Sequence, residues 1–250
     1  MTGFLAKAME AAAQRSARWR ADGLLQTLQR EAPQRGARRS FISALRNMRR
    51  PAVIAEFKRA SPSRGPIAVD SDPVKVAAAY VRGGAAALSV LTESQWFGGS
   101  LEDLRAVRAV CDRPILRKDF LVDEYDLQVS AAAGADAVLL IAAAFETPRL
   151  ADLVACAEKL EIDALVEAHD QRELERAEAA GAKLIGINSR DLGTLEVDVA
   201  GALRLLGQLH TGAVKILESG LRSRADMEAA GDAGADAVLI GEYLMRSGNP

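Results

Sequence analysis

The sequence predicts an α/β protein that folds as a single (β/α)8 barrel with an N-terminal helical extension. Its 250 residues are a normal length for one such barrel. A repeat supports this fold: Gly134–Leu139 recurs letter for letter as Gly234–Leu239, and weaker copies begin at Gly84 and Gly181. The four copies start 50, 47 and 53 residues apart, about the length of two βα units. Eight short apolar runs result, and eight alternating βα units close a parallel sheet into a barrel.

Three helices are predicted before the first strand, at residues 4–20, about 24–30 and about 40–47, with a break at Pro33 and Gly36. In each copy of the repeat an Ala-rich helix ends at the glycine, which takes the left-handed conformation. A buried parallel strand follows that glycine. The four other strands are predicted at residues 52–57, 114–118, 164–167 and 214–218.

A doubly wound open sheet is the alternative to the barrel. Such a sheet normally carries a Gly-rich fingerprint after its first strand. The segment Glu56-Phe-Lys-Arg59 stands there instead. The barrel is therefore the favoured fold.

We divide the chain into a helical extension at residues 1–50 and a barrel at residues 51–250. After the last strand only residues 242–250 remain, and they end in Gly-Asn-Pro. These three residues cannot support a regular helix. The last helix of the barrel is therefore predicted to be a stub of one or two turns.

The net charge of −2 hides an asymmetry along the chain. Residues 1–50 carry ten Arg and one Lys against three acidic residues, a charge of +8, and the rest of the chain carries −10. Such a basic arm is one signature of binding to nucleic acid or to an acidic partner. Here the arginines alternate with helix formers and no aromatic stacking platform accompanies them. We therefore interpret the arm as a helical extension lying on an acidic barrel, and expect no nucleic acid.

The composition predicts a cytoplasmic protein with no membrane partner. Residues 1–13 lack the pattern of a signal peptide, and the longest apolar run, Ala137–Phe145, is too short to cross a bilayer. Cys111 and Cys156 belong to no metal-binding pair, which fits two buried thiols in a reducing compartment. His169 and His210 are far apart in sequence, so no metal site is predicted.

Chemistry is expected where the strands end, because barrel enzymes build their sites at the C-terminal face. Charged side chains close five of the eight predicted strands, and such groups are costly to desolvate unless they are paired or liganded. A set of rim salt bridges is the structural alternative for any single member. The residues at these strand ends are Glu56, Lys58, Leu91 to Glu93, Lys118, Leu139, Glu167, Asn188, Glu218 and Gly241.

Two pairs within this set indicate acid/base chemistry. Glu56 and Lys58 are two residues apart on one strand, so both side chains point the same way. Lys118 and Glu167 end the third and fifth strands, which predicts an acid/base pair facing each other across a bound substrate. A Schiff-base lysine would leave the same pattern. His169, two residues beyond Glu167, is expected in the following loop.

Two glycines indicate a phosphate site. Gly220 follows the seventh predicted strand and Gly241 ends the eighth. Many barrels bind phosphate there through bare backbone N–H groups. Glycine also ends strands for steric reasons, so the signal has weight only together with the barrel.

At these residues the sequence resembles the indole-3-glycerol phosphate synthase family, from about residue 40 to residue 247. The segment Ile54–Ser63 resembles that family's signature around its first strand, and Gly186–Leu192 resembles a second specific motif. The other segments that resemble family motifs are Leu88–Glu93, Phe97–Ser100, Pro114–Phe120, Leu165–Glu167, Glu218–Gly220 and Leu239–Glu242.

The resemblance implies a cofactor-free enzyme that converts 1-(2-carboxyphenylamino)-1-deoxyribulose 5-phosphate to indole-3-glycerol phosphate. Lys118 would protonate the substrate ketone, and Glu167 would serve the later proton transfers, with Glu56 and Lys58 as a partner acid/base group. Asn188 and Arg190 would hold the sugar hydroxyls and the departing carboxylate, oriented by Ser61, Glu218 and Ser219. Phe97, Phe120 and Leu139 would wall the slot for the aromatic ring, and the backbone N–H groups of Gly220, Gly241 and Glu242 would bind phosphate.

One departure from the family pattern and two alternatives accompany this resemblance. Tyr243 stands where the family usually has a small residue, next to the phosphate loop. Phosphoribosylanthranilate isomerase is a related phosphate-binding barrel, but it relies on a Cys and Asp pair and Cys111 precedes its strand. A non-catalytic barrel that binds partners through its arm is the second alternative. We expect a monomer whose partner is a phosphorylated small molecule.

Overall fold

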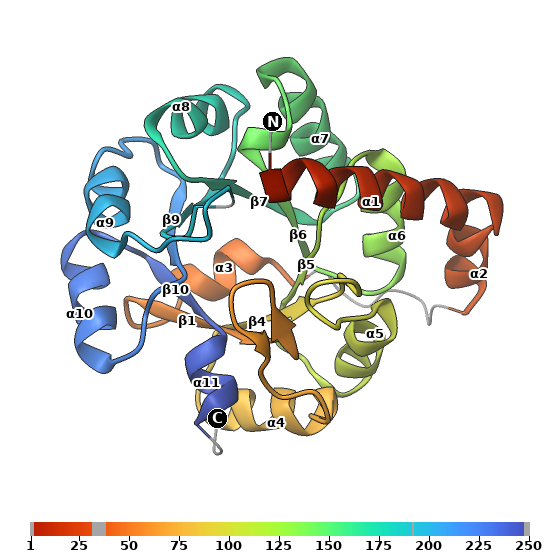
Figure 1. Cartoon of the computed structure of the whole chain (residues 1–250), viewed down its shortest axis with the longest axis horizontal. Coiled ribbons are helices and arrows are strands. Elements are labelled where there is room, and N and C mark those ends of the chain that lie inside the picture. Colours follow the sequence, from red (N-terminus) through yellow and green to blue (C-terminus); the bar gives the residue numbers. More distant parts are fainter. Residues whose placement is uncertain (1–2, 32–38, 192, 248–250) are drawn as a thin grey trace.

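The computed structural model describes residues 3–31, 39–191 and 193–247 and confirms the predicted barrel (Figure 1). Eight parallel strands close in the order β1-β4-β5-β6-β7-β8-β9-β10, with β10 pairing back to β1, so the fold is a TIM barrel. The strands are β1 (Ala52–Phe57), β4 (Ala87–Leu91), β5 (Ile115–Lys118), β6 (Ala137–Ile141), β7 (Asp163–Ala168), β8 (Leu184–Asn188), β9 (Val214–Glu218) and β10 (Ala237–Ile240).

A helix follows each barrel strand and covers the outside of the sheet (Figure 1). Six of these helices begin at a Ser or Asp whose side chain accepts a hydrogen bond from a first-turn N–H, which satisfies donors that the helix itself cannot. The helices are α4 (Pro73–Arg82), α5 (Leu101–Val110), α6 (Glu124–Ala132), α7 (Thr147–Lys159), α8 (Gln171–Ala179), α9 (Val199–Gly207), α10 (Arg224–Asp232) and α11 (Glu242–Arg246), with a short 3-10 helix η1 (Ala142–Ala144) before α7.

The glycine repeat has the conformation that the sequence predicts. Gly84, Gly134, Gly181 and Gly234 all have positive φ, between 77° and 97°. The aspartate of the exact repeat forms a hydrogen bond that was not predicted. Asp136 Oδ2 accepts the backbone N–H of Ile115, and the aspartate at the same repeat position, 236, accepts that of Lys215. Each exact copy therefore ends a helix and caps the neighbouring strand.

The core has an inner and an outer shell. Inward side chains such as Ile54, Leu116 and Leu165 fill the barrel, and α3 and part of α1 add to this cluster. Outward side chains such as Val166 and Leu217 pack against the surrounding helices. Because successive strand residues point to opposite sides, each strand serves both shells and also presents its last inward residue to the mouth.

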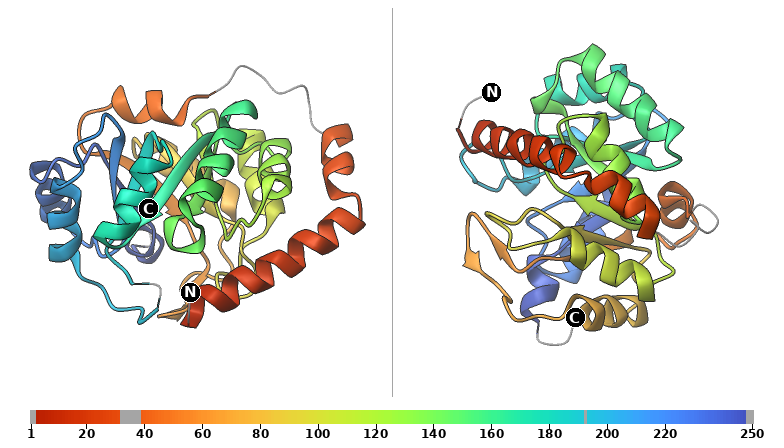
Figure 2. Two further views of the ribbon diagram at one scale, coloured as in Figure 1. Left: turned by 90° about the horizontal axis from the view of Figure 1, so that it is seen from above. Right: turned by 90° about the vertical axis from the view of Figure 1, so that its right-hand side faces the viewer.

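Three helices precede the barrel, two at its ends and one at its side (Figure 2): α1 (Gly3–Ala21), α2 (Leu24–Glu31) and α3 (Phe41–Arg46). The α1 helix runs along the end where the strands finish, and α2 packs against α6. The α3 helix lies at the opposite end, where the backbone N–H of Phe41 donates to Asp163 at the start of β7. The predicted break at Pro33 and Gly36 falls outside the described residues.

Two details near the mouth concern the ends of β1 and β10. A two-stranded antiparallel hairpin, β2 (Ala60–Ser61) with β3 (Gly65–Pro66), follows β1 and was not predicted. After β10, α11 is a single five-residue helix whose Leu244 and Met245 pack onto the core clusters. The residues 248–250, on which the prediction of a short last helix rested, lie outside the described residues.

Candidate active site

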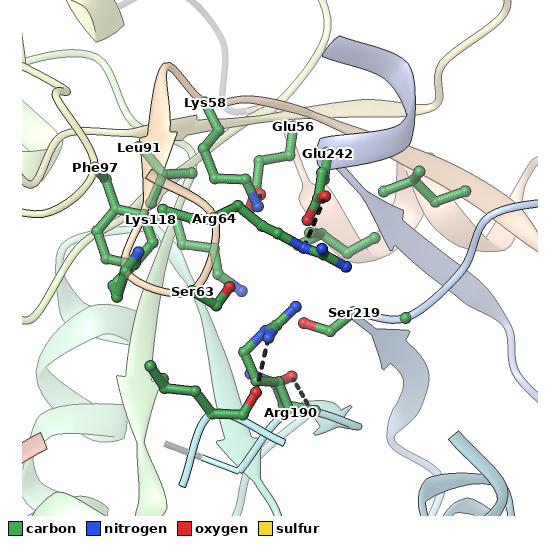
Figure 3. Close-up of a pocket in the computed structure, with 18 of the residues that line it drawn as sticks. Glu56, Lys58, Ser63, Arg64, Leu91, Phe97, Lys118, Arg190, Ser219 and Glu242 are labelled. Carbon is green, nitrogen blue, oxygen red and sulfur yellow. Dashed lines mark hydrogen bonds and ion pairs between the residues drawn. The ribbon is translucent and has the colours of Figure 1, made fainter. Parts of the chain in front are cut away.

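A cavity of about 440 Å³ opens at the C-terminal ends of the strands (Figure 3). Fourteen of the fifteen site residues predicted from the sequence line it, and Glu218 lies beneath its surface. Its members come from strands far apart in the sequence, as in other barrel sites. The fourteen are Glu56, Lys58, Ser61, Phe97, Lys118, Phe120, Leu139, Glu167, Asn188, Arg190, Ser219, Gly220, Gly241 and Glu242.

Lys118 is the central charge of the site. Its Nζ lies 3.3 Å from Glu167 Oε2 and also contacts Glu218 Oε2. Burial lowers the pKa of Lys118, but the carboxylates of Glu218, Glu167 and Glu56 raise it by more than burial lowers it. The net pKa of Lys118 therefore lies above its ordinary value. The lysine therefore carries a positive charge at neutral pH.

The predicted placement of Lys118 and Glu167 was wrong in one respect. They were expected to face each other across a bound substrate, but they form a direct ion pair. The reason is geometric: β5 and β7 are separated only by β6, and a four-carbon lysine stem spans the narrow interior of an eight-stranded barrel. One oxygen of Glu167 is thereby committed to the lysine.

Glu218 lies deeper than the sequence suggested. The resemblance made it a substrate-orienting residue, but its side chain is fully buried and it contacts Lys118 from below the cavity. Burial raises the pKa of Glu218 to about 7. Gly186 on β8 makes room for it, because a Cβ there would lie 2.0 Å from Glu218 Oε1. Glu218 is thus placed to position the lysine.

Glu56 and Lys58 point the same way, as predicted, and form an ion pair of 2.9 Å. Ser89 on the adjacent strand donates a 3.5 Å hydrogen bond to the other oxygen of Glu56. A Cβ at Gly241 would lie 2.4 Å from Glu56 Oε1. Gly241 therefore has a structural task besides the predicted phosphate contact, since it leaves space for this carboxylate.

The loops after β8 and β9 form another wall of the cavity. Asn188 Oδ1 accepts the backbone N–H of Arg190, and the Arg190 guanidinium donates to the carbonyl of Leu195 (Figure 3). Ser219 and Gly220 both have positive φ, 68° and 76°. For a serine this conformation is strained, and such strain is concentrated at functional sites.

One end of the cavity is rich in arginine. Arg64, from the β2/β3 hairpin, lies 3.4 Å from the Glu242 carboxylate (Figure 3). Arg246 lies at the same distance from Glu242. Arg222 also lines this end. The sequence reasoning missed these three arginines. Their positions in loops and in the short α11 carry no periodic signal, and only the fold brings them to the predicted glycines.

The other end is apolar. The rings of Phe97 and Phe120 are 6.4 Å apart and lie beside Leu139 in the cavity wall. Phe4 of α1 makes edge contacts with Phe120 and with Trp96, and it lines the cavity as well. Phe4 was also missed, because the arm was judged by its charges. The extension therefore contributes directly to the candidate site.

Two buried acids hold the loops that carry these rings. Glu93 accepts hydrogen bonds from the backbone N–H groups of residues 95–97. Asp119, next to Lys118, forms ion pairs with Arg117 and with Arg15 in α1, and Arg15 donates a hydrogen bond to the carbonyl of Phe120. The aromatic end is thus ordered by charged contacts.

Glu167 is shared between two basic groups. Burial raises its pKa, but Lys118, then His169 and a hydrogen bond from Asn188, lower it below the ordinary value. His169 Nε2 lies 3.5 Å from Glu167 Oε1, on the side away from Lys118. Glu167 is therefore an ionised carboxylate between a lysine and a histidine.

The described residues contain no group of three or more metal-ligating side chains and no helix long and apolar enough to span a membrane. Cys111 lies between α5 and β5, at the opposite end of that strand from Lys118. It is therefore not placed to act in this cavity, as the isomerase alternative would require.

Fold and site together define a (β/α)8-barrel enzyme with a buried lysine–carboxylate centre. Residues 5–250 match the family described as indole-3-glycerol phosphate synthase. The chain belongs to this family, the carboxy-lyases of tryptophan biosynthesis.

Individual relatives agree with this assignment. Indole-3-glycerol phosphate synthase 2 of Streptomyces coelicolor is 47% identical over 100% of this chain and 96% of its own length. The synthase of Mycolicibacterium gilvum is 54% identical over 80% of this chain and 73% of its own. That of Beutenbergia cavernae is 50% identical over 90% and 84%.

Two solved structures share the fold at low identity. The N-acetylmannosamine-6-phosphate 2-epimerase of Clostridium perfringens has a TM-score of 0.63 at 14% identity, covering 86% of this chain and 95% of the other. Thiamine phosphate pyrophosphorylase of Pyrococcus furiosus has a TM-score of 0.58 at 14% identity, covering 80% and 89%. At this identity the likeness concerns the barrel alone.

Proposed function

We propose that the cavity converts 1-(2-carboxyphenylamino)-1-deoxyribulose 5-phosphate into indole-3-glycerol phosphate, with loss of carbon dioxide and water. The observation that carries this proposal is the meeting of an apolar slot, a buried Lys118 and an arginine-rich end in one cavity. The reaction needs a place for an aromatic ring, a proton for a ketone and an anchor for a dianion. The names of the relatives point to the same product.

Lys118 is the general acid in this proposal. Its ammonium donates a proton to the ketone oxygen while the aryl carbon that bears the carboxylate bonds to the ketone carbon. Carbon dioxide then leaves with cleavage of the bond to that aryl carbon, and the ring regains its aromaticity. A charged donor aimed at the oxygen where negative charge develops stabilises the transition state more than the ground state.

Glu167 is the base of the second half of the reaction. The former ketone oxygen leaves as water, and the neighbouring carbon gives up a proton to complete the indole double bond. Glu167 suits this role because its lowered pKa keeps it ionised and it lies in the cavity wall beside Lys118. The ion pair of Glu56 and Lys58 supplies the partner acid/base group that protonates the departing hydroxyl.

The remaining residues bind and orient the substrate. Asn188, Arg190 and Ser219 hold the sugar hydroxyls and the carboxylate that departs. The buried hydroxyl of Ser61 has no hydrogen-bond partner among the described residues, which suits a contact with substrate. Glu218 acts through Lys118, and Phe97, Phe120 and Leu139 enclose the aromatic ring.

The phosphate binds at the arginine-rich end. The backbone N–H groups of Gly220, Gly241 and Glu242 are its ligands in this proposal, with Lys58 nearby. The left-handed Gly220 has no space for a side chain, because a Cβ would lie 2.6 Å from Val199. The arginines at this end add positive charge for a dianion.

Turnover of the carboxyphenylamino substrate, followed by the fluorescence of the indole product, tests the proposal. Lys118→Ala should lower kcat by roughly 10²–10⁴, the usual loss for a general acid, with a much smaller change in KM. Lys183→Ala, at an exposed position, is the matched control. An unchanged kcat with weaker binding would make Lys118 an anion clamp and not an acid.

We further propose that the chain acts as a monomer in the cytoplasm. The extension of the same chain completes the apolar end of the cavity, because Phe4 lines it. Cys111 and Cys156 are both free thiols, which fits a reducing compartment. Light scattering during gel filtration measures the mass in solution, and a dimer would contradict the first part.

A further inference from the structure

His169 lies between the candidate base and a carboxylate on the next helix. Its Nδ1 is 3.0 Å from Glu173 Oε2, and the same oxygen accepts the backbone N–H of His169 at 2.8 Å. On its other side Nε2 is 3.5 Å from Glu167 Oε1. The ring is therefore held at one nitrogen and aims the other at the carboxylate that faces Lys118.

Nε2 of His169 is a buried polar atom with no hydrogen bond to any described residue. Leaving a buried N–H without a hydrogen-bond partner is unfavourable in free energy, so an acceptor is expected next to this atom. Glu167 Oε1 is the facing oxygen, 3.5 Å away, and the two atoms do not form a hydrogen bond in this geometry. Catalytic hydrogen bonds are often long in free enzymes and shorten when substrate binds.

The charges that face His169 are acidic. Glu167 on β7, Glu173 on α8 and Glu218 on β9 all act on it, and Asp191 in the loop after β8 interacts with it too. Burial lowers the pKa of His169, but these carboxylates, with Glu173 first, raise it above its ordinary value. A positively charged ring between Glu173 and Glu167 is the state that this arrangement favours.

We propose that His169, held by Glu173, is a positioning residue that fixes the orientation and the negative charge of Glu167 during the reaction. This inference rests on the proposed role of Glu167 as the base. With Oε1 facing the imidazolium and Oε2 facing Lys118, the carboxylate cannot rotate freely, and each oxygen has a set partner. The arrangement resembles the general pattern in which a third group orients a catalytic pair.

The position of His169 also separates two hollows of the surface. Glu167 lines the catalytic cavity, whereas His169 lines a second, acidic cleft beside α9, with Asp191 and Asp198. Asn188 lines both. His169 therefore contacts Glu167 from a side that faces the second cleft and not the catalytic cavity.

NMR titration tests the pairing without any activity measurement. The chain has two histidines, and His210→Gln leaves His169 as the single imidazole signal. In this background His169 should titrate above the ordinary histidine value of about 6.5. The pKa of His169 should be lower in the Glu173→Gln variant, and also lower in a separate Glu167→Gln variant. A titration at the ordinary value that neither substitution moves would overturn the proposal.

Kinetics test the role in catalysis. His169→Ala should lower kcat by roughly 10- to 100-fold, as expected for a misplaced catalytic group, with little change in KM. His169→Gln keeps a donor for Glu167 without the charge, so it should restore part of kcat. In both variants the acidic limb of the kcat/KM profile should move to higher pH, because the pKa of Glu167 loses a neighbouring cation.

The outcomes separate this inference from the proposed function. His210→Gln, at an exposed site at the other end of the barrel, is the matched control and should leave kcat and the pH profile unchanged. If His169→Ala and His169→Gln behave like this control while Glu167→Gln is inactive, the inference fails and the role of Glu167 stands. If Glu167→Gln turns over normally, the proposed base is wrong.

Discussion

Two carboxylates of the site occupy space that a glycine leaves free. A Cβ at Gly186 would lie 2.0 Å from Glu218 Oε1, and a Cβ at Gly241 would lie 2.4 Å from Glu56 Oε1. Neither glycine has positive φ, so both are needed for space and not for backbone freedom. Barrel interiors are close-packed, and an added methyl group must displace the charged group that it meets.

Gly186→Ala should therefore impair activity through Lys118. The displaced Glu218 loses its contact with the lysine, and overpacking of this kind typically costs about 1–3 kcal/mol of stability. Gly207→Ala is the control, since a Cβ there meets no described atom outside its own helix within 4 Å. Gly207 is the last residue of α9 and is exposed. Calorimetry and steady-state kinetics on both variants check this, and equal behaviour would refute the steric argument.

His169 predicts a dependence of stability on pH. Its pKa is raised in the folded state, so the native protein binds the proton more tightly than the unfolded chain does. This stabilisation is fully present below the unfolded value of about 6.5 and is lost as the pH rises through the raised folded value. The Tm of the wild type relative to His169→Gln should therefore fall between pH 5.5 and pH 9. A constant difference would contradict the shift.

At the scale of elements, α1 packs against the loop that directly follows Lys118. Arg15 lies 3.0 Å from Asp119, whose side chain is fully buried, and it also donates to the carbonyl of Phe120. At the start of the same helix Phe4 packs on Phe120. A single helix thus contacts both Asp119 and the ring of Phe120 in the β5–α6 loop.

Arg15→Ala should raise KM and lower stability. Hydrogen bonds to charged groups contribute about 1.5–3 kcal/mol, and Asp119 would keep only its partners within the barrel. Arg18→Ala, exposed on the same helix, is the matched control and should resemble the wild type. Fluorescence assays give KM, and thermal melts give the stability. Identical values for the two variants would show that α1 does not order the loop.

The barrel elements could be predicted closely, because their signals are local. The strands Ala52–Phe57 and Val214–Glu218 have the predicted bounds, and the four repeat glycines have the predicted conformation. The strand-end residues also converge as expected, since a parallel barrel gathers all its C-terminal ends at one mouth. The division of the chain at residue 50 stays a prediction.

The contacts that the sequence did not predict all depend on distance in space. Phe4 reaches the cavity from a helix more than a hundred residues before its partner Phe120. Arg64 lies in a hairpin of two-residue strands, which is too short for a periodic pattern. The ion pair of Lys118 with Glu167 depends on the width of the barrel interior, which no single strand encodes.

At the scale of the whole molecule, the two ends of the barrel have different tasks. At the strand starts, Asp163 caps α3, and the side chains at 136 and 236 accept neighbouring strand N–H groups. At the strand ends Glu56, Glu167 and Glu218 pair with lysine side chains of the site instead of capping backbone. One end uses carboxylates for stability, and the other concentrates buried charge that favours function at some cost in stability.

Substitution at each end should therefore give opposite results. Asp236 accepts the N–H of Lys215 at 2.9 Å and pairs with Arg50 at 2.8 Å, so Asp236→Asn should destabilise the fold. A loss of about 1–3 kcal/mol lowers the Tm of a chain this long by roughly 2–4 °C per kcal/mol. The kcat of Asp236→Asn should stay near the wild-type value, because its side chain lies at the far end of β10 from the cavity.

Glu167→Gln removes one charge from the buried cluster at the mouth. It should abolish most turnover, while its Tm falls less than that of Asp236→Asn, since Lys118 retains Glu218 as its partner. Thermal melts and steady-state kinetics on the two variants, in one buffer, measure both effects. A stable Asp236→Asn with low kcat, or an active Glu167→Gln with the larger loss of Tm, would reverse the assignment of the two ends.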